Sequence, residues 1–320
     1  MLGLLQAYRS SLKAIDVEEP IDLVVHRPLA FLIAKLAEKT PVTPNQLTVL
    51  SMSLGMAAGA ALLGWAEPAA PIAGALLFLS QVVDCSDGML ARMRKTASEI
   101  GRMLDGIADL ITLATALAGA TWLLVRANAA PSWMPWLVVA AVALTIHTSS
   151  LHTGAYDHYK NFHLALTRGS REEDLQQATR RWEKATASPL PFVHRVIFSV
   201  YLGYLRKQVR FLSWFDPATT ARYSELPQLD PVRAAAYRKH NGHLLDVWRS
   251  LFGVGSLVFG FAVFTAIGHL EIFLVYRLVF LNAIFFGWLM PAQRRASRAI
   301  AAELRVGPSP SLTELRPSAA

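Results

Sequence analysis

The chain has 320 residues, of which 53% are hydrophobic and 17% are charged, and its mean hydropathy is +0.34. This composition is too apolar for an ordinary soluble domain and favours a membrane protein. The net charge of +8 then indicates basic cytoplasmic loops and contact with anionic lipid rather than nucleic-acid binding. The single cysteine, Cys85, excludes an intramolecular disulfide and a cysteine-based zinc site, and we expect it only to pack.

Residues 1–43 form an N-terminal segment in which one short helix is predicted. Leu29, Leu32, Ile33 and Leu36 recur on one helical face, and the charged residues nearby lie off that face. This pattern predicts an amphipathic helix lying on the membrane surface. A soluble packing helix is the alternative interpretation.

The first transmembrane helix is predicted from about Leu47 to Trp65. The residues before this span have the pattern of a helix N-terminus. Thr43 can serve as N-cap, Pro44 suits the first turn and Gln46 can complete a capping box.

Four aspartates lie where the second predicted span gives way to the third. Asp84 and Asp87 share one face of a helix, and Asp105 and Asp109 share a face of the next. Small residues on the same faces keep them open to a bulky ligand, and these are Gly88, Ala91 and Gly101.

The residue types in this stretch indicate a particular chemistry. A carboxylate at a bilayer centre costs roughly 2.5–3.5 kcal/mol on insertion scales, so four of them require a polar cavity and a compensating cation. Because the donors are all oxygen, the pattern favours Mg²⁺ or Mn²⁺ over zinc or copper. Arg92 adds a planar guanidinium suited to phosphate. Together these residues predict a site, with acids for two metals, that transfers a phosphate ester.

Apolar runs predict six transmembrane helices, since each run approaches the ~20 residues that cross a bilayer. After the first span, the second runs from about Ala69 to the aspartate stretch 84–109, and the third starts within that stretch and continues to about Val125. The last three run from about Trp133 to Leu151, from Leu251 to Gly268 and from Ile272 to Met290. The predicted fold is therefore an all-α integral membrane protein whose two termini lie on the same side.

The distribution of lysine and arginine predicts the orientation. Residues 66–70, 127–131 and 269–271, the loops on one side, contain neither residue, whereas the loops on the other side are basic. By the positive-inside rule, the basic side, which carries both termini and the aspartates, is cytoplasmic. Arg126 and Arg277 lie towards the outer ends of their helices, and we expect both to snorkel to the outer interface.

The remaining organisation follows from these spans. Residues 44–155 carry the first four spans, 156–245 form a cytoplasmic helical insertion, 246–292 carry the last two spans, and 293–320 form a partly disordered tail. Inside the insertion, a basic amphipathic stretch between Val193 and Phe215 is expected to rest on the bilayer or over the mouth of the site. A solvated charged face without a role in substrate choice is the alternative.

The aspartate stretch resembles the signature of the CDP-alcohol phosphotransferases, D-x2-D-G-x2-A-R-x8-G-x3-D-x3-D. All eight fixed positions are present between Asp84 and Asp109, and a chance match has odds of about one in 10⁹ per window. Pro44, Asn45 and Thr48 are also similar to the start of the first membrane helix in this family, although Asn45 and Thr48 could equally serve only to cap a helix.

The resemblance implies an enzyme of phospholipid biosynthesis that transfers a phospho-alcohol group, with CDP-diacylglycerol as the first candidate donor, to an acceptor hydroxyl and releases CMP. It implies that Asp84, Asp87 and Asp105 bind Mg²⁺ or Mn²⁺ in a two-metal site, while Asp109 bridges to a metal or acts as the base. The implied contacts to the CDP group are Gly88, Ala91, Arg92, Gly101, Asn45 and Thr48. It further implies a homodimer, and we expect a bacterial inner membrane rather than an organelle membrane.

The acceptor is less well defined. Relatives whose acceptor carries a phosphate tend to have a basic residue after the fourth aspartate, where this chain has Leu110. The departure favours a phosphate-free alcohol such as serine, inositol or choline, or a lipid hydroxyl accepting from CDP-choline or CDP-ethanolamine. His147, Asp157 and Lys160, near the cytoplasmic end of the fourth span, are candidate acceptor contacts, with ordinary interfacial placement as the alternative.

Two non-enzymatic classes remain open. A cation transporter could use membrane carboxylates, but it would place them near the midplane between discontinuous helices. A catalytically silent lipid-binding scaffold could keep the fold, yet it need not retain all four aspartates. Metal-dependent release of CMP distinguishes the enzyme from both.

Overall fold

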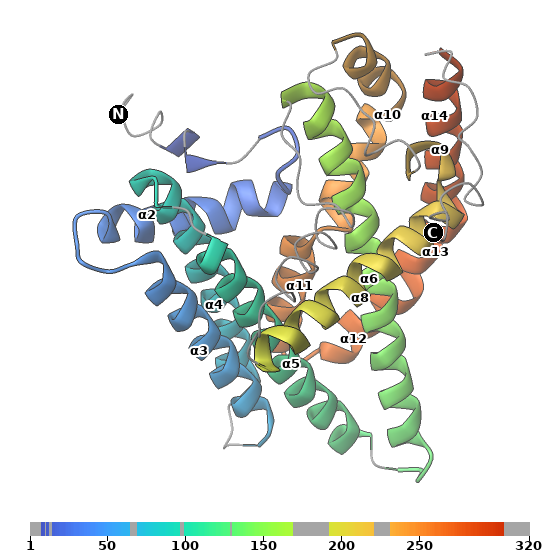
Figure 1. The fold of residues 1–320 in the computed structure, drawn as a ribbon. Coiled ribbons are helices and arrows are strands. Elements are labelled where there is room, and N and C mark those ends of the chain that lie inside the picture. Colours follow the sequence, from blue (N-terminus) through green and yellow to red (C-terminus); the bar gives the residue numbers. More distant parts are fainter. Residues whose placement is uncertain are drawn as a thin grey trace. The chain divides into compact units, whose positions relative to one another are not determined.

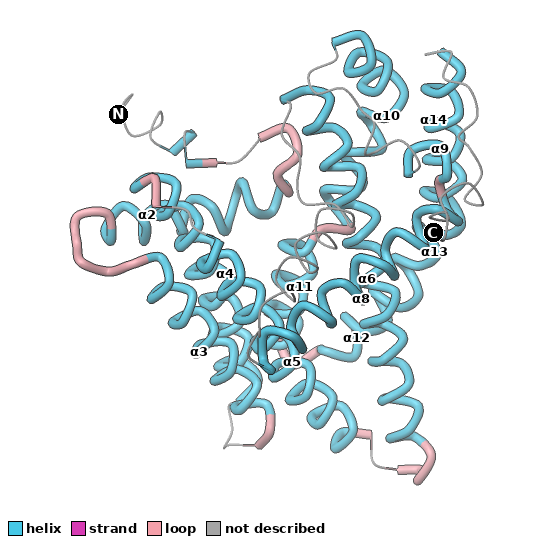
Figure 2. The backbone as a smooth tube through the Cα atoms, in the orientation of Figure 1, coloured by secondary structure: helices cyan, strands magenta, loops and turns pink. Residues whose placement is uncertain are grey.

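The structure of the protein is a computed structural model. It describes residues 8–9, 11–12, 15–64, 69–96, 99–128, 130–168, 192–220 and 231–303. Within these ranges all regular structure is helical (Figure 2), which confirms the all-α prediction. The predicted disorder of the C-terminal tail from Gly307 falls outside the described residues.

Figure 1 shows the helices in their order along the chain. In chain order they are η1 (Asp22–His26), α2 (Arg27–Ala37), α3 (Pro44–Leu62), α4 (Ala69–Arg94), α5 (Glu99–Ala127), α6 (Met134–Arg168), α8 (Phe192–Phe215), α9 (Pro217–Thr220), α10 (Pro231–Leu251), α11 (Val254–Ala266), α12 (Leu270–Val275), η3 (Tyr276–Leu281), α13 (Asn282–Ile284), η4 (Phe285–Leu289) and α14 (Met290–Glu303). The elements η1, η3 and η4 are short π-helical segments.

Five stretches of the described chain are long and apolar enough to cross a membrane. They are Ala69–Arg94, Leu104–Ala127, Met134–Thr167, Ala234–Ala266 and Leu270–Glu303. Each overlaps one of the second to sixth predicted spans, so the protein has the helices of a multi-pass membrane protein. The first predicted span forms α3, a helix of 19 residues that is not among the five. A total of six spans therefore stays a prediction.

The chain forms two compact units. The first comprises Met1–Ser150 and Arg249–Asn282, and the second comprises Leu151–Trp248 and Ala283–Ala320. All four motif aspartates belong to the first unit.

The start of α3 has the predicted capping box. The backbone N–H of Gln46 donates to the side-chain oxygen of Thr43, and the backbone N–H of Thr43 donates to the Gln46 side chain at 2.9 Å. Pro44 occupies the first turn. Because these bonds satisfy donors that a helix start leaves unpaired, they define where α3 begins.

Helices α3 and α5 approach each other backbone to backbone. A Cβ atom added to Gly59 would lie 2.5 Å from the backbone oxygen of Thr115, and one added to Gly119 would lie 2.4 Å from the backbone oxygen of Gly59. Only glycine fits at such contacts, which are typical of small residues at membrane helix interfaces. The helix that carries Asp105 and Asp109 is thereby held directly against α3.

Helix α2 has two different apolar faces. Ala30, Phe31 and Ala34 are buried in a core shared with α4. On the other face, Leu32 is 56% exposed and Leu36 is 78% exposed. The exposed face is the one that the sequence assigns to lipid, and its placement on a membrane surface stays a prediction.

Arg94, at the end of α4, holds the connection between α2 and α3. Its guanidinium donates to four backbone carbonyl groups, those of Ala37, Glu38, Thr40 and Val42. These carbonyls belong to the end of α2 and the loop that follows, where the helix itself supplies no partners. Arg94 therefore ties the end of the motif helix to the segment that leads into α3.

The prediction that Arg277 snorkels outwards is wrong. The residue is only 2% exposed, and its Nη2 atom donates to the Oγ atom of Ser149 at 2.9 Å. Ser149 lies on α6, so the partner comes from a helix that is distant in sequence. Periodicity within a single helix could not show that such a partner was present. Arg126, by contrast, is exposed.

The second unit is built on a buried aromatic and polar cluster. Tyr159 of α6 donates to the carboxylate of Asp216 at 2.8 Å, and Tyr237 of α10 donates to the backbone oxygen of Tyr159 at 3.1 Å. Trp248 donates to the side-chain oxygen of Gln293 on α14. The stretch between Val193 and Phe215 forms α8, as its helical spacing predicts, while its role and the bounds of the predicted insertion stay predictions.

Candidate functional site

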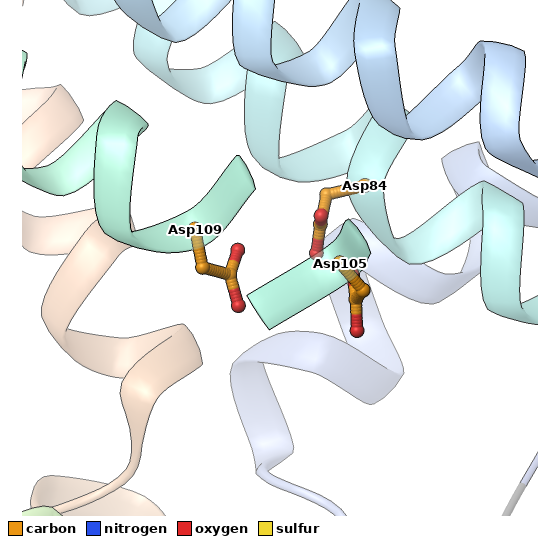
Figure 3. Close-up of side chains that lie close together, drawn as sticks. All are labelled: Asp84, Asp105 and Asp109. Atoms are coloured by element: carbon orange, nitrogen blue, oxygen red, sulfur yellow. The ribbon is translucent and has the colours of Figure 1, made fainter. Parts of the chain in front are cut away.

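Three of the four motif aspartates converge at one place. Asp84 on α4 and Asp105 and Asp109 on α5 each offer one oxygen atom, and these atoms all lie within 4.8 Å of one another (Figure 3). Asp84 and Asp105 are half-buried, whereas Asp109 is exposed. The cluster therefore joins two helices and is accessible at Asp109.

The glycines around the cluster leave room beside it. A Cβ atom on Gly106, next to Asp105, would meet nothing within 4 Å. On α4, a Cβ atom on Gly88 would lie 3.4 Å from the Nη1 atom of Arg92. Gly88 lies one helical turn before Arg92, and the guanidinium of Arg92 lies along the bare backbone of Gly88.

The fourth aspartate, Asp87, has a different environment. It is only 8% exposed, and its carboxylate accepts a short hydrogen bond from the hydroxyl of Thr48 on α3. Thr48 is itself 3% exposed. Sequence reasoning assigned Thr48 to the nucleotide, whereas in the structure its hydroxyl binds and orients Asp87. Asn45 is exposed on the first turn of the same helix.

The cluster of Asp84, Asp105 and Asp109 fits a divalent metal. Ionised carboxylates at this separation repel one another, and a cation between them offsets the repulsion. All three donors are hard oxygen ligands, the type that Mg²⁺ and Mn²⁺ prefer. An acidic site of this composition can hold a hard cation and, through it, the oxygen atoms of a phosphate.

Arg92 supplies positive charge on the same helix as Asp84 and Asp87. Its Nε atom donates to the backbone oxygen of Ser11 at 2.7 Å. Its Nη2 atom is buried and has no hydrogen-bond partner within the described chain. The N-terminal segment therefore holds the Nε–H group of Arg92 and leaves the Nη2 group free to donate to a ligand.

Sequence reasoning missed Arg27, the first residue of α2. Arg27 is close enough to Asp84 to attract its carboxylate electrostatically. The available signal was a cation at the start of a largely apolar helix. That signal could not be connected with Asp84, because only the packing of α2 on α4 brings the two together.

The candidate acceptor residues belong to two different compact units. His147 is exposed and belongs to the first unit. Asp157 and Lys160 belong to the second unit and pair with each other at 2.7 Å, one helical turn apart. Each of these two charges is thus already offset by the other, and a role in acceptor binding stays a prediction.

The fold and the site together define a class. The protein is a multi-pass helical membrane protein with three carboxylates from two adjacent helices placed for a hard divalent cation, and with an arginine on one of those helices. Comparison with known proteins refines this class. Residues 41–165 match the family described as CDP-alcohol phosphatidyltransferase. The chain therefore carries a CDP-alcohol phosphatidyltransferase domain at these residues, which confirms the resemblance seen in residues 84–109.

Curated relatives agree with this domain. The chain is 31% identical over 178 residues to the bifunctional IPC transferase and DIPP synthase of Aquifex aeolicus, covering 52% of this chain and 40% of that protein. It is 38% identical over 99 residues to the phosphatidylinositol phosphate synthase of Corynebacterium glutamicum, covering 31% of this chain and 44% of that protein. The chain thus spans less than half of the length of each relative.

Proposed function

We propose that the protein is a metal-dependent CDP-alcohol phosphotransferase of phospholipid biosynthesis. The observation that carries the proposal is the convergence of Asp84, Asp105 and Asp109 inside a domain of this family. The proposed donor is a CDP-linked lipid, with CDP-diacylglycerol first. The site faces the cytoplasm of a bacterial inner membrane, and the enzyme works as a homodimer.

The aspartates have separate roles in this proposal. Asp84, Asp87 and Asp105 bind Mg²⁺ or Mn²⁺, with Asp109 as a further ligand or as the base. The hydroxyl of Thr48 keeps Asp87 turned towards the site, in the way that outer hydrogen bonds orient metal ligands. When bound, the metal ions would stabilise the negative charge that builds on the diphosphate.

The transfer itself is a displacement at phosphorus. Asp109 takes the proton of the acceptor hydroxyl, and its exposure leaves it accessible to that acceptor. The acceptor oxygen forms a bond to the β-phosphorus of the donor, and the bond between that phosphorus and the bridging oxygen breaks. CMP leaves with this oxygen, and the product keeps the phosphodiester.

The proposed acceptor is a small alcohol without a phosphate. Leu110, directly after Asp109, is 54% exposed and offers no positive charge to an acceptor phosphate. The name of the Corynebacterium relative, phosphatidylinositol phosphate synthase, makes inositol and inositol phosphate the most informative pair to compare. A lipid hydroxyl that accepts from CDP-choline or CDP-ethanolamine is the second candidate.

The test is CMP release by the protein in nanodiscs with Mg²⁺ or Mn²⁺. CDP-diacylglycerol is supplied with serine, inositol, choline, glycerol phosphate or inositol phosphate in turn, and CDP-choline or CDP-ethanolamine is supplied with diacylglycerol. We expect CMP with one pair, its loss with EDTA, and its loss in Asp109→Asn. Asp246→Asn, at an exposed aspartate of the second unit, is the matched control and should keep activity.

Two results would contradict the proposal. Release of CMP that continues unchanged in Asp109→Asn would remove the proposed role of that residue. A folded, metal-binding protein that forms no CMP with any pair would favour the scaffold or the transporter instead.

A further inference from the structure

Arg27 lies in an environment that the Asp84–Asp109 motif does not account for. Its side chain is only 13% exposed, and its Nη2 atom donates to the Oε2 atom of Glu18 at 3.2 Å. Its Nε atom is buried and has no hydrogen-bond partner within the described chain. The Oε1 atom of Glu18, on the carboxylate that pairs with Arg27, is also buried without a partner within the described chain. A buried donor without a partner is costly, so the Nε–H group of Arg27 can still donate to a ligand that supplies an acceptor.

The packing of α2 places Arg27 beside the motif helix. Ala30 and Phe31, on the next turn of α2, share a core with Val82, Cys85 and Met89 of α4. Arg27 consequently interacts electrostatically with residues of that helix, attracting Asp84 and repelling Arg92.

Arg27 and Arg92 repel each other electrostatically, and both are held by the N-terminal segment. The N-terminal segment supplies an acceptor to each, through Glu18 for Arg27 and the backbone oxygen of Ser11 for Arg92. Each guanidinium keeps one buried donor unpartnered, Nε in Arg27 and Nη2 in Arg92. The two guanidinium groups also interact electrostatically with the carboxylates of Asp22, Asp84 and Asp87. The unpartnered donors, rather than an uncompensated charge, therefore make the pair suited to a further acceptor.

We propose that Arg27 and Arg92 together bind the diphosphate of the CDP-linked donor, with Arg27 as a donor-binding residue supplied from outside the Asp84–Asp109 motif. The proposal rests on the proposed function, because the anion it requires is the donor's diphosphate. A guanidinium fits phosphate oxygens through paired N–H groups, whereas an ammonium group acts as a single point of charge. Arg27 would therefore bind the diphosphate of the donor, next to the cluster of Asp84, Asp105 and Asp109.

The experiment measures the donor and the acceptor separately. CDP-diacylglycerol is titrated into nanodiscs that contain the full-length protein and Mn²⁺, and the KM of each substrate is measured with the acceptor found for the wild type. For Arg27→Gln we expect donor affinity to fall by about 10- to 100-fold, the loss typical of a charge-assisted hydrogen bond. The KM of the acceptor should stay unchanged.

Three further variants separate binding from structure. Arg27→Lys keeps the charge without the planar fork, and it should show a smaller loss of donor affinity than Arg27→Gln. Lys35→Gln removes a positive charge from an exposed position of the same helix and should bind the donor normally. Glu18→Gln removes the ion pair but leaves Arg27 in place, so it should lower the unfolding midpoint without a comparable loss of donor affinity.

Each opposing result has a distinct meaning. Donor affinity of Arg27→Gln within twofold of the wild type would show that Arg27 only pairs with Glu18 and would overturn the inference, leaving the proposed function intact. A rise in acceptor KM with unchanged donor affinity would overturn it by assigning Arg27 to the acceptor. A wild-type protein that binds no CDP-linked donor would overturn the inference and the proposed function together.

Discussion

The close contact of α3 and α5 makes a strong prediction for Gly119→Ala. Gly119 lies on α5, the helix that carries Asp105 and Asp109. The added Cβ atom would lie 2.4 Å from the backbone oxygen of Gly59, whereas ordinary van der Waals contact begins at 3.4 Å. Because the obstructing atom belongs to a backbone, no side-chain rotation relieves the clash, and the helices must separate by roughly 1 Å.

The size of the effect follows from two opposing terms. Gly→Ala inside an open helix is stabilising by about 1 kcal/mol, and overpacking a close contact is destabilising by about 1–3 kcal/mol. Gly106→Ala, on the same helix, is the matched control because its Cβ atom would meet nothing within 4 Å. The gain in helix propensity is common to both variants, so we expect Gly119→Ala to be less stable than Gly106→Ala by roughly 1–3 kcal/mol.

The assay is unfolding by SDS in detergent micelles, followed by tryptophan fluorescence, for the wild type and both variants. CMP release should also fall in Gly119→Ala, since a shift of α5 against α3 moves Asp105 and Asp109 relative to Asp84. Equal unfolding midpoints for Gly119→Ala and Gly106→Ala would refute the backbone contact between α3 and α5.

Two further predictions concern the neighbourhood of the site. Thr48→Val removes the hydrogen bond to Asp87 and should weaken activation by Mn²⁺ roughly 10- to 100-fold. Thr48→Ser keeps the hydroxyl and should stay near the wild type. Equal activation by Mn²⁺ in both variants would argue against Asp87 as a metal ligand. Burial raises the pKa of Glu19, whose carboxylate accepts from the backbone N–H groups of Gly255 at 3.0 Å and Ser256 at 2.8 Å. The folded state therefore favours the protonated form of Glu19, and this proton contributes to the free energy of unfolding. The contribution is complete below the unfolded pKa of about 4.5 and is lost as pH rises through the higher folded pKa. Thermal unfolding should accordingly show the wild type losing stability relative to Glu19→Gln as pH rises from 4.5, and parallel curves would contradict this linkage.

The helices and the motif could be predicted from the sequence because both depend on local pattern. A run of about 20 apolar residues is long enough to span a bilayer whatever surrounds it, and the capping chemistry of Thr43 and Gln46 is completed within one turn. In the same way, i and i+4 spacing places Asp105 and Asp109 on one helical face. These features need no knowledge of the neighbouring helices.

Features that join distant segments depended on the tertiary structure. Spacing could not show that Thr48 of α3 binds Asp87 of α4, that Arg27 lies beside Asp84, or that α6 provides a partner for Arg277. The direction of a side chain along its own helix is set by local geometry, but its partner is set by which helix packs alongside. The amino-acid sequence by itself therefore determined the four motif aspartates and the chemistry available to them. Helix packing decided which of those residues meet, because glycine contacts such as Gly119 on Gly59 set how closely two backbones can approach.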